Sequence, residues 1–387
     1  SLHFVHVAGT NGKGSTVAMT ANILQRAGYR TGLYISPYVT EFRERFQING
    51  QMIGQKDFAR LLEKIIPYAE EMKMQGDGIN EFECNTALAF LYFAEQKCDV
   101  VCLEVGLGGR CDSTNIIDTA LVSVITAISL DHTKVLGDTV AQIAHEKAGI
   151  IKATTSVVTY PKQDDDALVV IMEECAKKNS SLIMPNIGGL HITNADIFGS
   201  DFCYGNQCYH IGLVGKHQVY NCLMVLEVMQ ILTQMGYVIP REAMLDGISQ
   251  TKFPARFEVV SSKPLIVIDG AHNYSGMKAL TQTIKQLHCF PKVAVIGMLA
   301  DKDYTEAVKL ISPLCKQIFT VPIDNPRSLS PQQLKNSIQP YCQEVTAYSS
   351  REEALQMAFE KLEEEDTMLI CGSLYLAGEM RLAVLQK

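Results

Sequence analysis

A glycine-rich segment at residues 9–16, GTNGKGST, constrains the fold of this chain more than any other feature. An apolar run at residues 4–8 precedes it, and a helix-like segment at residues 17–27 follows it. In such a strand–loop–helix unit, glycines let backbone N–H groups approach an anion and the helix N-terminus adds positive potential, so a phosphate site is predicted. Lys13 would supply a point charge for the terminal phosphates, and Ser15 would hold Mg²⁺.

The segment departs from the standard nucleotide-binding loop in two ways. No glycine lies five residues before Gly12, and Gly14 separates Lys13 from the hydroxyl of Ser15. The alternative is a glycine-rich turn that binds nothing. The order of strand, glycines, lysine and hydroxyl favours the phosphate site and indicates a subfamily with its own spacing.

Composition narrows the class of protein. A chain of 387 residues favours two domains. A net charge of -8 argues against a general nucleic-acid binder, because a polyanion requires a basic surface. The twelve cysteines include no Cys-x-x-Cys pair, which suggests neither a zinc module nor a disulfide framework and fits a reducing cytoplasm. No apolar run approaches the roughly 18 residues of a membrane span, so we expect a soluble protein.

Apolar, β-branched runs alternate with helix-patterned segments in the first part of the chain, which is typical of a mostly parallel sheet with crossover helices. The expected strands are residues 4–8, 31–35, 99–105, 120–128 and 156–160. The expected helices include residues 55–74, 86–96 and 217–235. Between residues 181 and 214, short strands and a Gly-Asn turn predict an antiparallel flap at the edge of this domain.

Strand and helix patterns restart after the sequence KFPAR at residues 252–256. We therefore expect an α/β protein with a larger N-terminal domain at residues 1–253 and a smaller Rossmann-like domain at residues 254–387. The expected strands of the second domain are residues 265–268, 293–298, 318–322 and 368–371, and its expected helices include residues 275–287, 304–314 and 351–362.

Polar residues follow several of the predicted strands, where open α/β sheets bind their ligands. Glu104 ends the third strand, and a carboxylate there suits Mg²⁺. The sequence GLGG at residues 106–109 follows it and would let a ligand approach closely. His132 follows the fourth strand; taken alone it is more often a satisfied polar residue than a ligand of Mg²⁺.

Lys147 lies between Glu146 and Ala148 on an apolar stretch, behind a helix that begins near residues 138–139. A buried ammonium is costly unless it is paired or modified, so Lys147 either has an anionic partner or has lost its charge. The alternative is a surface lysine paired with Glu146.

In the second domain, Arg256 and Asp269 are the notable candidates. Asp269 follows a strand and precedes a glycine, an arrangement suited to ribose recognition, and the planar guanidinium of Arg256 suits phosphate oxygens. A linker ion pair or a turn cap would explain each of them equally well. Together with residues 9–16 they suggest a nucleotide held by both domains.

Taken together, these motifs resemble the folylpolyglutamate synthase and dihydrofolate synthase family, which belongs to the Mur ligase superfamily of ATP-dependent amide ligases. The resemblance covers nearly the whole chain. It rests on residues 9–15, 36–37, 41–46, 82–83, 104–112, 131–133, 146–150, 217–218 with 221, 256–258 and 269–273.

The resemblance implies an ATP and Mg²⁺ site that spans both domains. Lys13, His132 and Lys147 would be catalytic, and Lys147 matches a lysine that the family carbamylates. The implied metal-binding residues are Ser15, Ser36, Glu104, His132 and Lys147. The implied nucleotide-binding residues are Gly12, Lys13, Gly14, Ser15, Thr16, Asn221, Arg256, Asp269 and His272.

The resemblance also implies where the folate binds. The implied residues are Ser36, Pro37, Phe82, Gly106, Leu107, Gly108 and Gly109. Two departures concern neighbouring positions: Tyr38 replaces a histidine often found after Ser-Pro, and Ala255 stands where the family often has glycine. Family members usually carry several tens of residues before the phosphate loop, including part of the pteridine pocket, whereas eight precede Gly9 here.

The implied reaction is ligation of L-glutamate to the γ-carboxylate of a folate by a cytoplasmic, monomeric enzyme. ATP would phosphorylate the carboxylate, and the amine of glutamate would attack the acyl phosphate. One alternative is ligation of glutamate to dihydropteroate, alone or in addition. The other is a P-loop ATPase or nucleotide sensor that makes no amide. The latter gives no reason for Lys147 or for the second domain.

Overall fold

A computed structural model describes residues 2–300 and 304–386 of the chain. The chain forms two compact units, Ser1–Leu190 with Tyr220–Thr251, and His191–Val219 with Lys252–Lys387. The single boundary between residues 253 and 254 stays a prediction, and residues 191–219 are the stretch that packs with the later unit. No helix among the described residues is both long and apolar enough to cross a bilayer.

An eight-stranded sheet forms the centre of the first unit, in the order β4-β3-β2-β5-β1-β6-β7-β8. The pairs from β2 to β8 are parallel, and the β3–β4 hairpin joins β2 in antiparallel fashion. The mostly parallel sheet predicted from sequence is therefore confirmed. Its strands are β1 (Phe4–Ala8), β2 (Thr31–Tyr34), β3 (Phe46–Ile48), β4 (Gln51–Met52), β5 (Val100–Glu104), β6 (Val122–Ile125), β7 (Ser156–Thr159) and β8 (Ser181–Ile183).

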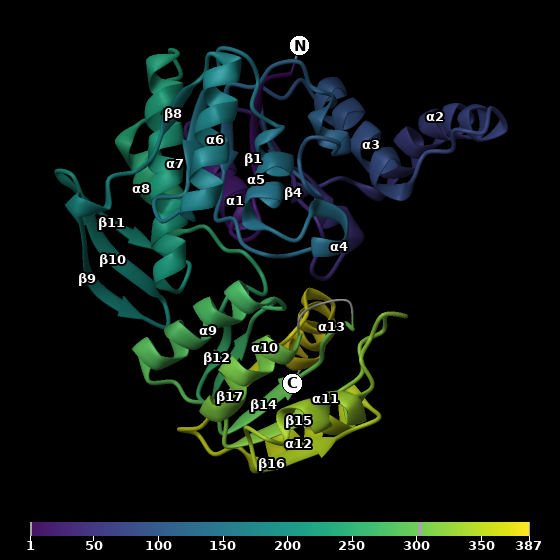
Figure 1. Cartoon of the computed structure of the whole chain (residues 1–387), viewed down its shortest axis with the longest axis vertical. Helices are drawn as coiled ribbons and strands as arrows, with labels where there is room; N and C mark the ends of the chain where they lie inside the picture. Colours follow the sequence, from purple (N-terminus) through teal and green to yellow (C-terminus); the bar gives the residue numbers. More distant parts are fainter. Residues whose placement is uncertain (1, 301–303, 387) are drawn as a thin grey trace. The chain divides into compact units, whose positions relative to one another are not determined.

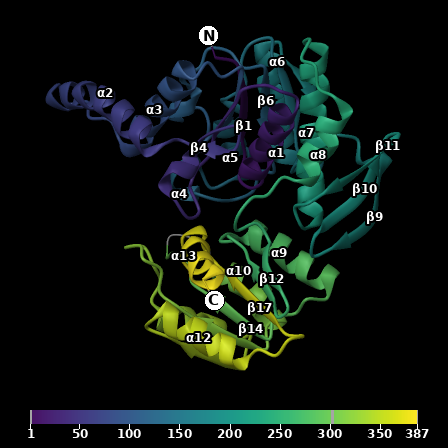
Figure 2. The same ribbon diagram turned by 180° about the vertical axis from the view of Figure 1, so that it is seen from behind.

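Helices cover both faces of this sheet. Figure 1 shows α5 and α6 on one face, and Figure 2 shows α1 and α8 on the other. Parallel strands buried on both faces must be apolar throughout, and β1 and β5 are buried at every position. The helices are α1 (Lys13–Arg26), α2 (Gln55–Met74), α3 (Glu81–Glu95), α4 (Thr133–Leu136), α5 (Val140–Ala148), α6 (Asp165–Lys178), α7 (Lys216–Gln234) and α8 (Arg241–Ser249).

Two helices begin earlier than predicted from sequence, and local chemistry explains both. Helix α1 begins at Lys13, because Gly12 adopts φ 93° and the chain enters the helix directly from the glycine-rich loop. Helix α3 begins at Glu81 because Asn80 and Glu83 form a capping box that satisfies the first N–H groups. The start of α5 near residues 138–139 is confirmed by the Thr139 cap.

The predicted antiparallel flap is present as a three-stranded sheet, β11-β10-β9. Its strands are β9 (Leu190–Asp196), β10 (Gly199–Tyr204) and β11 (Gln207–Ile211). Cys203 and Cys208 face each other across the β10–β11 hairpin and form a disulfide. This bridge was not predicted, because the two cysteines become neighbours only through the turn at Gly205.

A six-stranded sheet, β12-β13-β17-β14-β15-β16, forms the centre of the second unit. Only the edge strand β12 is antiparallel, which confirms the smaller Rossmann-like α/β architecture. The strands are β12 (Glu258–Ser262), β13 (Leu265–Ile268), β14 (Val293–Ile296), β15 (Gln317–Thr320), β16 (Glu344–Ala347) and β17 (Thr367–Cys371). The helices are α9 (Tyr274–Leu287), α10 (Tyr304–Ile311), α11 (Pro331–Ile338), α12 (Arg351–Lys361) and α13 (Leu374–Leu385).

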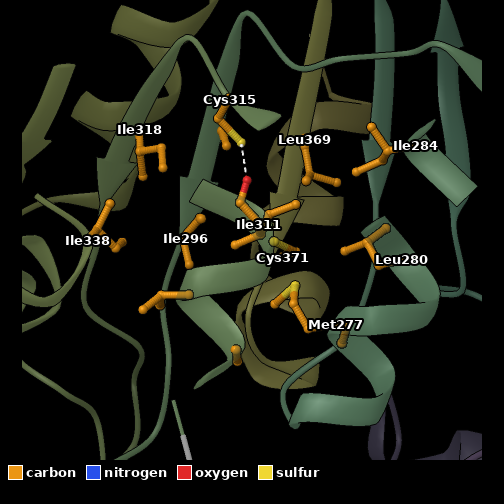
Figure 3. Close-up of a cluster of buried hydrophobic side chains, with 14 of the residues drawn as sticks. Met277, Leu280, Ile284, Ile296, Ile311, Cys315, Ile318, Ile338, Leu369 and Cys371 are labelled. Atoms are coloured by element: carbon orange, nitrogen blue, oxygen red, sulfur yellow. Dashed lines mark hydrogen bonds between the residues drawn. The ribbon is translucent and has the colours of Figure 1, made fainter. Parts of the chain in front are cut away.

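The core of the second unit lies between this sheet and helices α9, α10 and α11. Figure 3 shows Met277, Leu280 and Ile284 of α9 pointing toward strand residues such as Ile296 and Leu369. These side chains are almost fully buried. Each such residue contributes about 1.5–3 kcal/mol by leaving water, so the cluster anchors the strand ends that carry the polar loops.

Candidate nucleotide and acceptor site

The glycine-rich loop at residues 9–16 packs too tightly for side chains. A Cβ on Gly9 would lie 1.8 Å from Oγ1 of Thr126, and one on Gly12 would lie 2.7 Å from Oδ1 of Asn221. Both glycines also have positive φ, of 152° and 93°. The structure thus brings Asn221 of α7 against the loop, as its predicted nucleotide role requires.

Lys13 is folded back over the loop. Its Nζ donates to the carbonyl oxygens of Gly9 at 3.1 Å and Thr10 at 3.4 Å. The Thr16 hydroxyl donates to the Gly12 carbonyl at 2.9 Å, and Ser15 is almost fully buried in the first turn of α1. The ammonium and the helix N-terminus therefore lie on the same loop, as a phosphate site requires.

Glu104 and Ser36 meet at the carboxyl ends of two neighbouring strands, β5 and β2. Oε2 of Glu104 accepts a hydrogen bond from the backbone N–H of Ser36 at 3.1 Å, and Glu104 is 4% exposed. Because β5 pairs with β1, Glu104 lies opposite Val7, just before the phosphate loop. Two of the predicted metal-binding residues are thus side by side.

The oxygen-rich character of this corner fits Mg²⁺, which prefers carboxylate and hydroxyl ligands. Within residues 2–300 and 304–386 no group of three His, Cys, Asp or Glu side chains is gathered as a metal cluster. A site built from Ser15, Ser36 and Glu104 would therefore depend on hydroxyls, water and phosphate oxygens, which Mg²⁺ commonly uses.

His132 lies at the start of α4 with φ 51°. Its backbone N–H donates to Oδ1 of Asp131, and its Nε2 lies 3.8 Å from the same oxygen. The preceding segment is tied to the phosphate loop, because the Thr10 hydroxyl donates to the carbonyl of Ser129 at 3.0 Å. His132 thus follows a segment anchored at the loop, and its metal role stays a prediction.

Lys147 is buried on α5, with 5% of its surface exposed. Its Nζ donates to the carbonyl oxygen of Gly9 at 2.9 Å, across 138 positions of sequence. The alternative of a surface lysine is therefore wrong. The structure joins Lys147 to the phosphate loop, and an acceptor that is a neutral carbonyl leaves the charge itself uncompensated by that bond.

The glycine loop at residues 106–109 packs between Phe82 and the end of α5. A Cβ on Gly106 would lie 2.4 Å from Cζ of Phe82, and one on Gly109 would lie 2.9 Å from the carbonyl oxygen of Lys147. The N–H of Arg110 donates to the carbonyl of Glu146 at 2.7 Å. The predicted acceptor loop and the buried lysine therefore share one turn of α5.

The loop after Ser36-Pro37 contains positioning residues that were not predicted from sequence. The Glu44 carboxylate accepts hydrogen bonds from the N–H groups of Val39, Thr40 and Glu41. The Arg45 guanidinium lies 5.4 Å from the ring centre of Tyr38. The pattern Glu-x-x-Glu at residues 41–44 is a capping-box signal that could have indicated the first of these contacts.

In the second unit, Asp269 organises the candidate residues. Its two carboxylate oxygens accept hydrogen bonds from the N–H groups of Phe257 and Ala271, each at 2.7 Å. Desolvation raises the pKa of Asp269, while the Arg256 guanidinium and the two N–H donors oppose that shift. His272 is adjacent, with Nδ1 2.8 Å from the carbonyl oxygen of Gly270.

Arg256 contacts the same turn. Its Nη1 donates to the carbonyl of Ala255 at 3.1 Å, and its guanidinium lies 5.3 Å from the ring centre of Phe253. A Cβ on Gly270 would lie 2.9 Å from that same Nη1. The structure thus brings Arg256, Asp269 and His272 together at the carboxyl end of β13.

A separate groove of about 1190 Å³ lies between α2 and α3 in the first unit. It is lined by apolar side chains that include Leu2, Phe4, Tyr68 and Phe90. Leu2 and Phe4 lie at the N-terminal end of β1, whereas the phosphate loop follows its carboxyl end. The groove is therefore not part of the candidate site.

Family models match both units. The Mur ligase middle domain matches residues 7–229, and the Mur ligase glutamate ligase domain matches residues 255–374. With the parallel sheet, the phosphate loop and the smaller Rossmann-like sheet, these matches define the chain as an ATP-dependent ligase of the Mur type.

Relatives narrow the class further. The chain is 35% identical to a dihydrofolate synthase/folylpolyglutamate synthase of Bacillus subtilis, over 97% of this chain and 89% of the relative. It is 34% identical to a folylpolyglutamate synthase of Lacticaseibacillus casei, over 99% and 90%. The chain belongs to the folylpolyglutamate synthase/dihydrofolate synthase family.

A solved structure shows the same fold. The folylpolyglutamate synthase of Mycobacterium tuberculosis, complexed with ADP and AMPPCP, matches with a TM-score of 0.91 and 29% identity, over 99% of this chain and 91% of that one. Escherichia coli FolC in complex with DHPP and ADP matches with a TM-score of 0.87 and 30% identity, over 99% and 88%.

Proposed function

We propose that this protein joins L-glutamate to the γ-carboxylate of tetrahydrofolate or a folylpolyglutamate and couples the reaction to ATP. One observation carries the proposal. Lys147 donates to the phosphate loop at Gly9, and the turn that holds it packs against Gly109 of the acceptor loop. A phosphate donor and a carboxylate acceptor bound at these two loops would meet at one place, as phosphoryl transfer requires.

The chemistry follows from the reactants. A carboxylate does not condense with an amine at neutral pH, so its oxygen attacks the γ-phosphorus of ATP and ADP leaves. The amine of glutamate then attacks the acyl carbon, and phosphate leaves with the former carboxylate oxygen. Lys13 is positioned on the loop to offset charge on the transferring phosphoryl group.

Ser15, Ser36 and Glu104 would hold Mg²⁺, with His132 and Lys147 completing the metal-binding set. When bound, the metal offsets charge on the phosphates and on the oxyanion that follows. The contact between Ser36 and Glu104, and the place of Glu104 beside the end of β1, support this assignment.

Carbamylation of Lys147 belongs to the same proposal. The group is almost fully buried, and its bond to a carbonyl does not neutralise an ammonium. Adding CO₂ to the amine would convert the buried cation into an anion that can ligate a metal ion, which removes the electrostatic cost of the bare ammonium.

The nucleotide site would be completed by Gly12, Gly14, Thr16 and Asn221 in the first unit, and by Arg256, Asp269 and His272 in the second. The contact of Asn221 with Gly12 and the cluster around Asp269 support these roles. Ser36, Pro37 and Phe82, with the glycine loop at residues 106–109, would hold the folate. The exposed Leu107 at the tip of that loop is available to contact it.

Ligation of glutamate to dihydropteroate is a second candidate activity. The Escherichia coli neighbour is described in complex with DHPP, and the Bacillus subtilis relative is named for both activities. Because the packing of Phe82 on Gly106 serves a pterin ring equally well in both substrates, the two activities must be separated by assay.

The test is product mass with each acceptor in turn. The protein, ATP, Mg²⁺ and L-glutamate are incubated with tetrahydrofolate or with dihydropteroate. The proposal predicts a folate heavier by one glutamyl residue, and loss of that product by at least about 100-fold in Lys13→Ala. A Lys56→Ala variant, which alters an exposed lysine on α2, keeps wild-type activity.

ATP hydrolysis that proceeds without either acceptor, with no amide product, would indicate a nucleotide sensor instead. We further propose a cytoplasmic monomer, for which light scattering on the eluted peak gives a mass near 42.8 kDa. A mass of twice that value contradicts the monomer and leaves the ligase assignment intact.

A further inference from the structure

A fully buried histidine in the central strand of the first unit has a partner far away in sequence. Nε2 of His6 in β1 lies 2.9 Å from Oγ1 of Thr114, and both residues are 0% exposed. A polar pair at the centre of an apolar sheet costs free energy unless its groups are satisfied, so its presence requires a reason.

The proton positions in this pair follow from the next contact. The Thr114 hydroxyl donates to Oδ1 of Asp112 at 2.5 Å, because a carboxylate oxygen can only accept. Its one proton is thereby used, and it must accept the proton of His6 Nε2–H. Nδ1 of His6 is buried and makes no hydrogen bond within the described part of the chain, which leaves the imidazole as the Nε2–H tautomer.

The chain of contacts ends at the acceptor loop. The other carboxylate oxygen of Asp112, Oδ2, accepts from the backbone N–H of Leu107 at 2.8 Å. Oδ1 also accepts from the N–H of Thr114 at 3.0 Å. The side chain of Asp112 is therefore fixed on one side by Thr114, and it fixes the glycine loop on the other.

The contacts close a ring between the two loops of the candidate site. His6 lies three residues before Gly9 in the strand that leads into the phosphate loop. Lys147 returns from Gly9 to α5, and the N–H of Arg110 binds the carbonyl of Glu146 on that helix. The acceptor loop is thus held from two sides, by α5 and by the His6–Thr114–Asp112 chain.

We propose that His6 and Thr114 are positioning residues for the folate acceptor, acting through Asp112 on the backbone of residues 106–109. Neither side chain touches a substrate. This inference rests on the proposed function, because it assigns the acceptor to that loop.

The kinetic test uses two substitutions of one residue. Thr114→Val keeps the shape and removes the hydroxyl, whereas Thr114→Ser keeps the hydroxyl and removes the methyl group. In Thr114→Val the KM for the folate rises about tenfold and the KM for ATP changes less than twofold, as expected for loss of about one hydrogen bond. Thr114→Ser retains the wild-type KM for the folate.

A merely structural role predicts another pattern. In that case both variants lose thermal stability and neither shifts the KM of one substrate alone. Equal rises in both KM values, or an unchanged folate KM in a folded Thr114→Val protein, would overturn the inference. A wild-type protein that glutamylates no folate refutes the proposed function instead, so the two failures are distinguishable.

A spectroscopic test applies to the wild-type protein and needs no variant to fold. Nitrogen-15 NMR of histidine-labelled protein at pH 7 is expected to show His6 protonated at Nε2 and bare at Nδ1. Hydrogen exchange at Leu107 is expected to accelerate in Thr114→Val and to stay unchanged at residues 9–16. An imidazolium, an Nδ1–H tautomer, or unchanged exchange at Leu107 contradicts the proposed chain.

Discussion

The two units hold their candidate charged groups in opposite ways. The first unit buries a cation, Lys147, which donates to a single carbonyl oxygen of Gly9. The second unit holds an anion, Asp269, whose oxygens accept from two backbone N–H groups beside Arg256. Asp269 is satisfied by its own turn, whereas the charge of Lys147 calls for a modification or a ligand. The difference indicates that the first unit carries the chemistry and that the second unit recognises.

The backbone shows a parallel difference. At Gly9 and Gly12 the first unit uses glycine where the chain adopts positive φ against neighbouring atoms. At Ala255 and Phe257 the second unit adopts φ of 56° and 46° with side chains present. The first arrangement requires glycine for space as well as conformation, and the second bears a conformational cost of about 1–2 kcal/mol per residue.

The largest expected effect is at the phosphate loop. Gly9→Ala would place a Cβ 1.8 Å from Oγ1 of Thr126 and displace the backbone that Lys13 and Lys147 contact. We expect kcat to fall by about 100-fold or more, since a displacement near 1 Å has that effect on reacting groups. Steady-state kinetics with circular dichroism measures it.

Gly28→Ala is the matched control, because Gly28 has φ 95° and no atom lies within 4 Å of the place that its Cβ would take. It bears the conformational cost without the clash, so stability falls by about 1 kcal/mol and kcat stays unchanged. Equal losses of kcat in the two variants contradict a role for space at Gly9.

The next effect concerns the buried cation. Lys147→Ala removes the group that joins the two loops, and we expect kcat to fall by roughly 10²–10³-fold, as for loss of an electrostatic group in an enclosed site. Activity of the wild-type protein is expected to rise with bicarbonate after CO₂ is depleted. Intact-protein mass before and after depletion measures the modification.

Lys152→Ala serves as the comparison, since Lys152 bonds to the carbonyl of Asn115 and not to the phosphate loop. It is expected to keep its bicarbonate response. A wild-type rate that is independent of bicarbonate, with an unmodified amine at Lys147, contradicts carbamylation and leaves the metal-binding assignment to Ser15, Ser36 and Glu104.

A smaller effect is the pH dependence of stability. Burial lowers the pKa of His6 to about 3, and Lys152 adds to the shift. Between the ordinary value near 6.5 and about 3, the unfolded chain therefore binds a proton that the folded chain does not, so stability falls as pH falls. Urea unfolding of wild type and His6→Gln from pH 7.5 to 4.5 compares the slopes.

The variant is expected to show the shallower fall, because glutamine does not titrate. The difference between the two curves isolates His6 from the carboxylates that titrate in both proteins. Parallel curves contradict a neutral, buried His6. Desolvation also lowers the pKa of His217 in the second unit, to about 4, so a corresponding His217 variant is expected to show the same sign.

The smallest effect is at Ala255. Glycine relieves the positive φ of 56° but loses a buried methyl group worth about 0.8 kcal/mol. We expect Ala255→Gly to raise the free energy of unfolding by up to about 1 kcal/mol, measured by urea denaturation. A fall of more than about 1 kcal/mol shows that packing of the methyl group outweighs the backbone cost.

Much of the fold could be predicted from patterns that are local. Strand β13 and helix α2 coincide with the predicted residues 265–268 and 55–74, because each has an unbroken apolar run or stripe. The β3–β4 hairpin and the disulfide between Cys203 and Cys208 were missed, since each depends on a partner strand that periodicity does not identify.

The candidate site shows the same division. The order of glycines, Lys13 and Ser15 predicted the phosphate loop, and the ends of strands predicted Glu104 and Asp269. The bond from Lys147 to Gly9 spans 138 positions, and that from His6 to Thr114 spans 108. Such contacts are set by the order of strands in the sheet, so no local pattern could have indicated them.

The decisive measurement follows the carboxylate oxygen. A folate labelled with ¹⁸O in its γ-carboxylate is incubated with the protein, ATP, Mg²⁺ and L-glutamate, and the inorganic phosphate is analysed by mass. An acyl phosphate intermediate predicts one ¹⁸O atom in the phosphate for each glutamyl residue added, because the bridging oxygen leaves with phosphorus. Glutamylated product accompanied by unlabelled phosphate contradicts phosphoryl transfer to the acceptor.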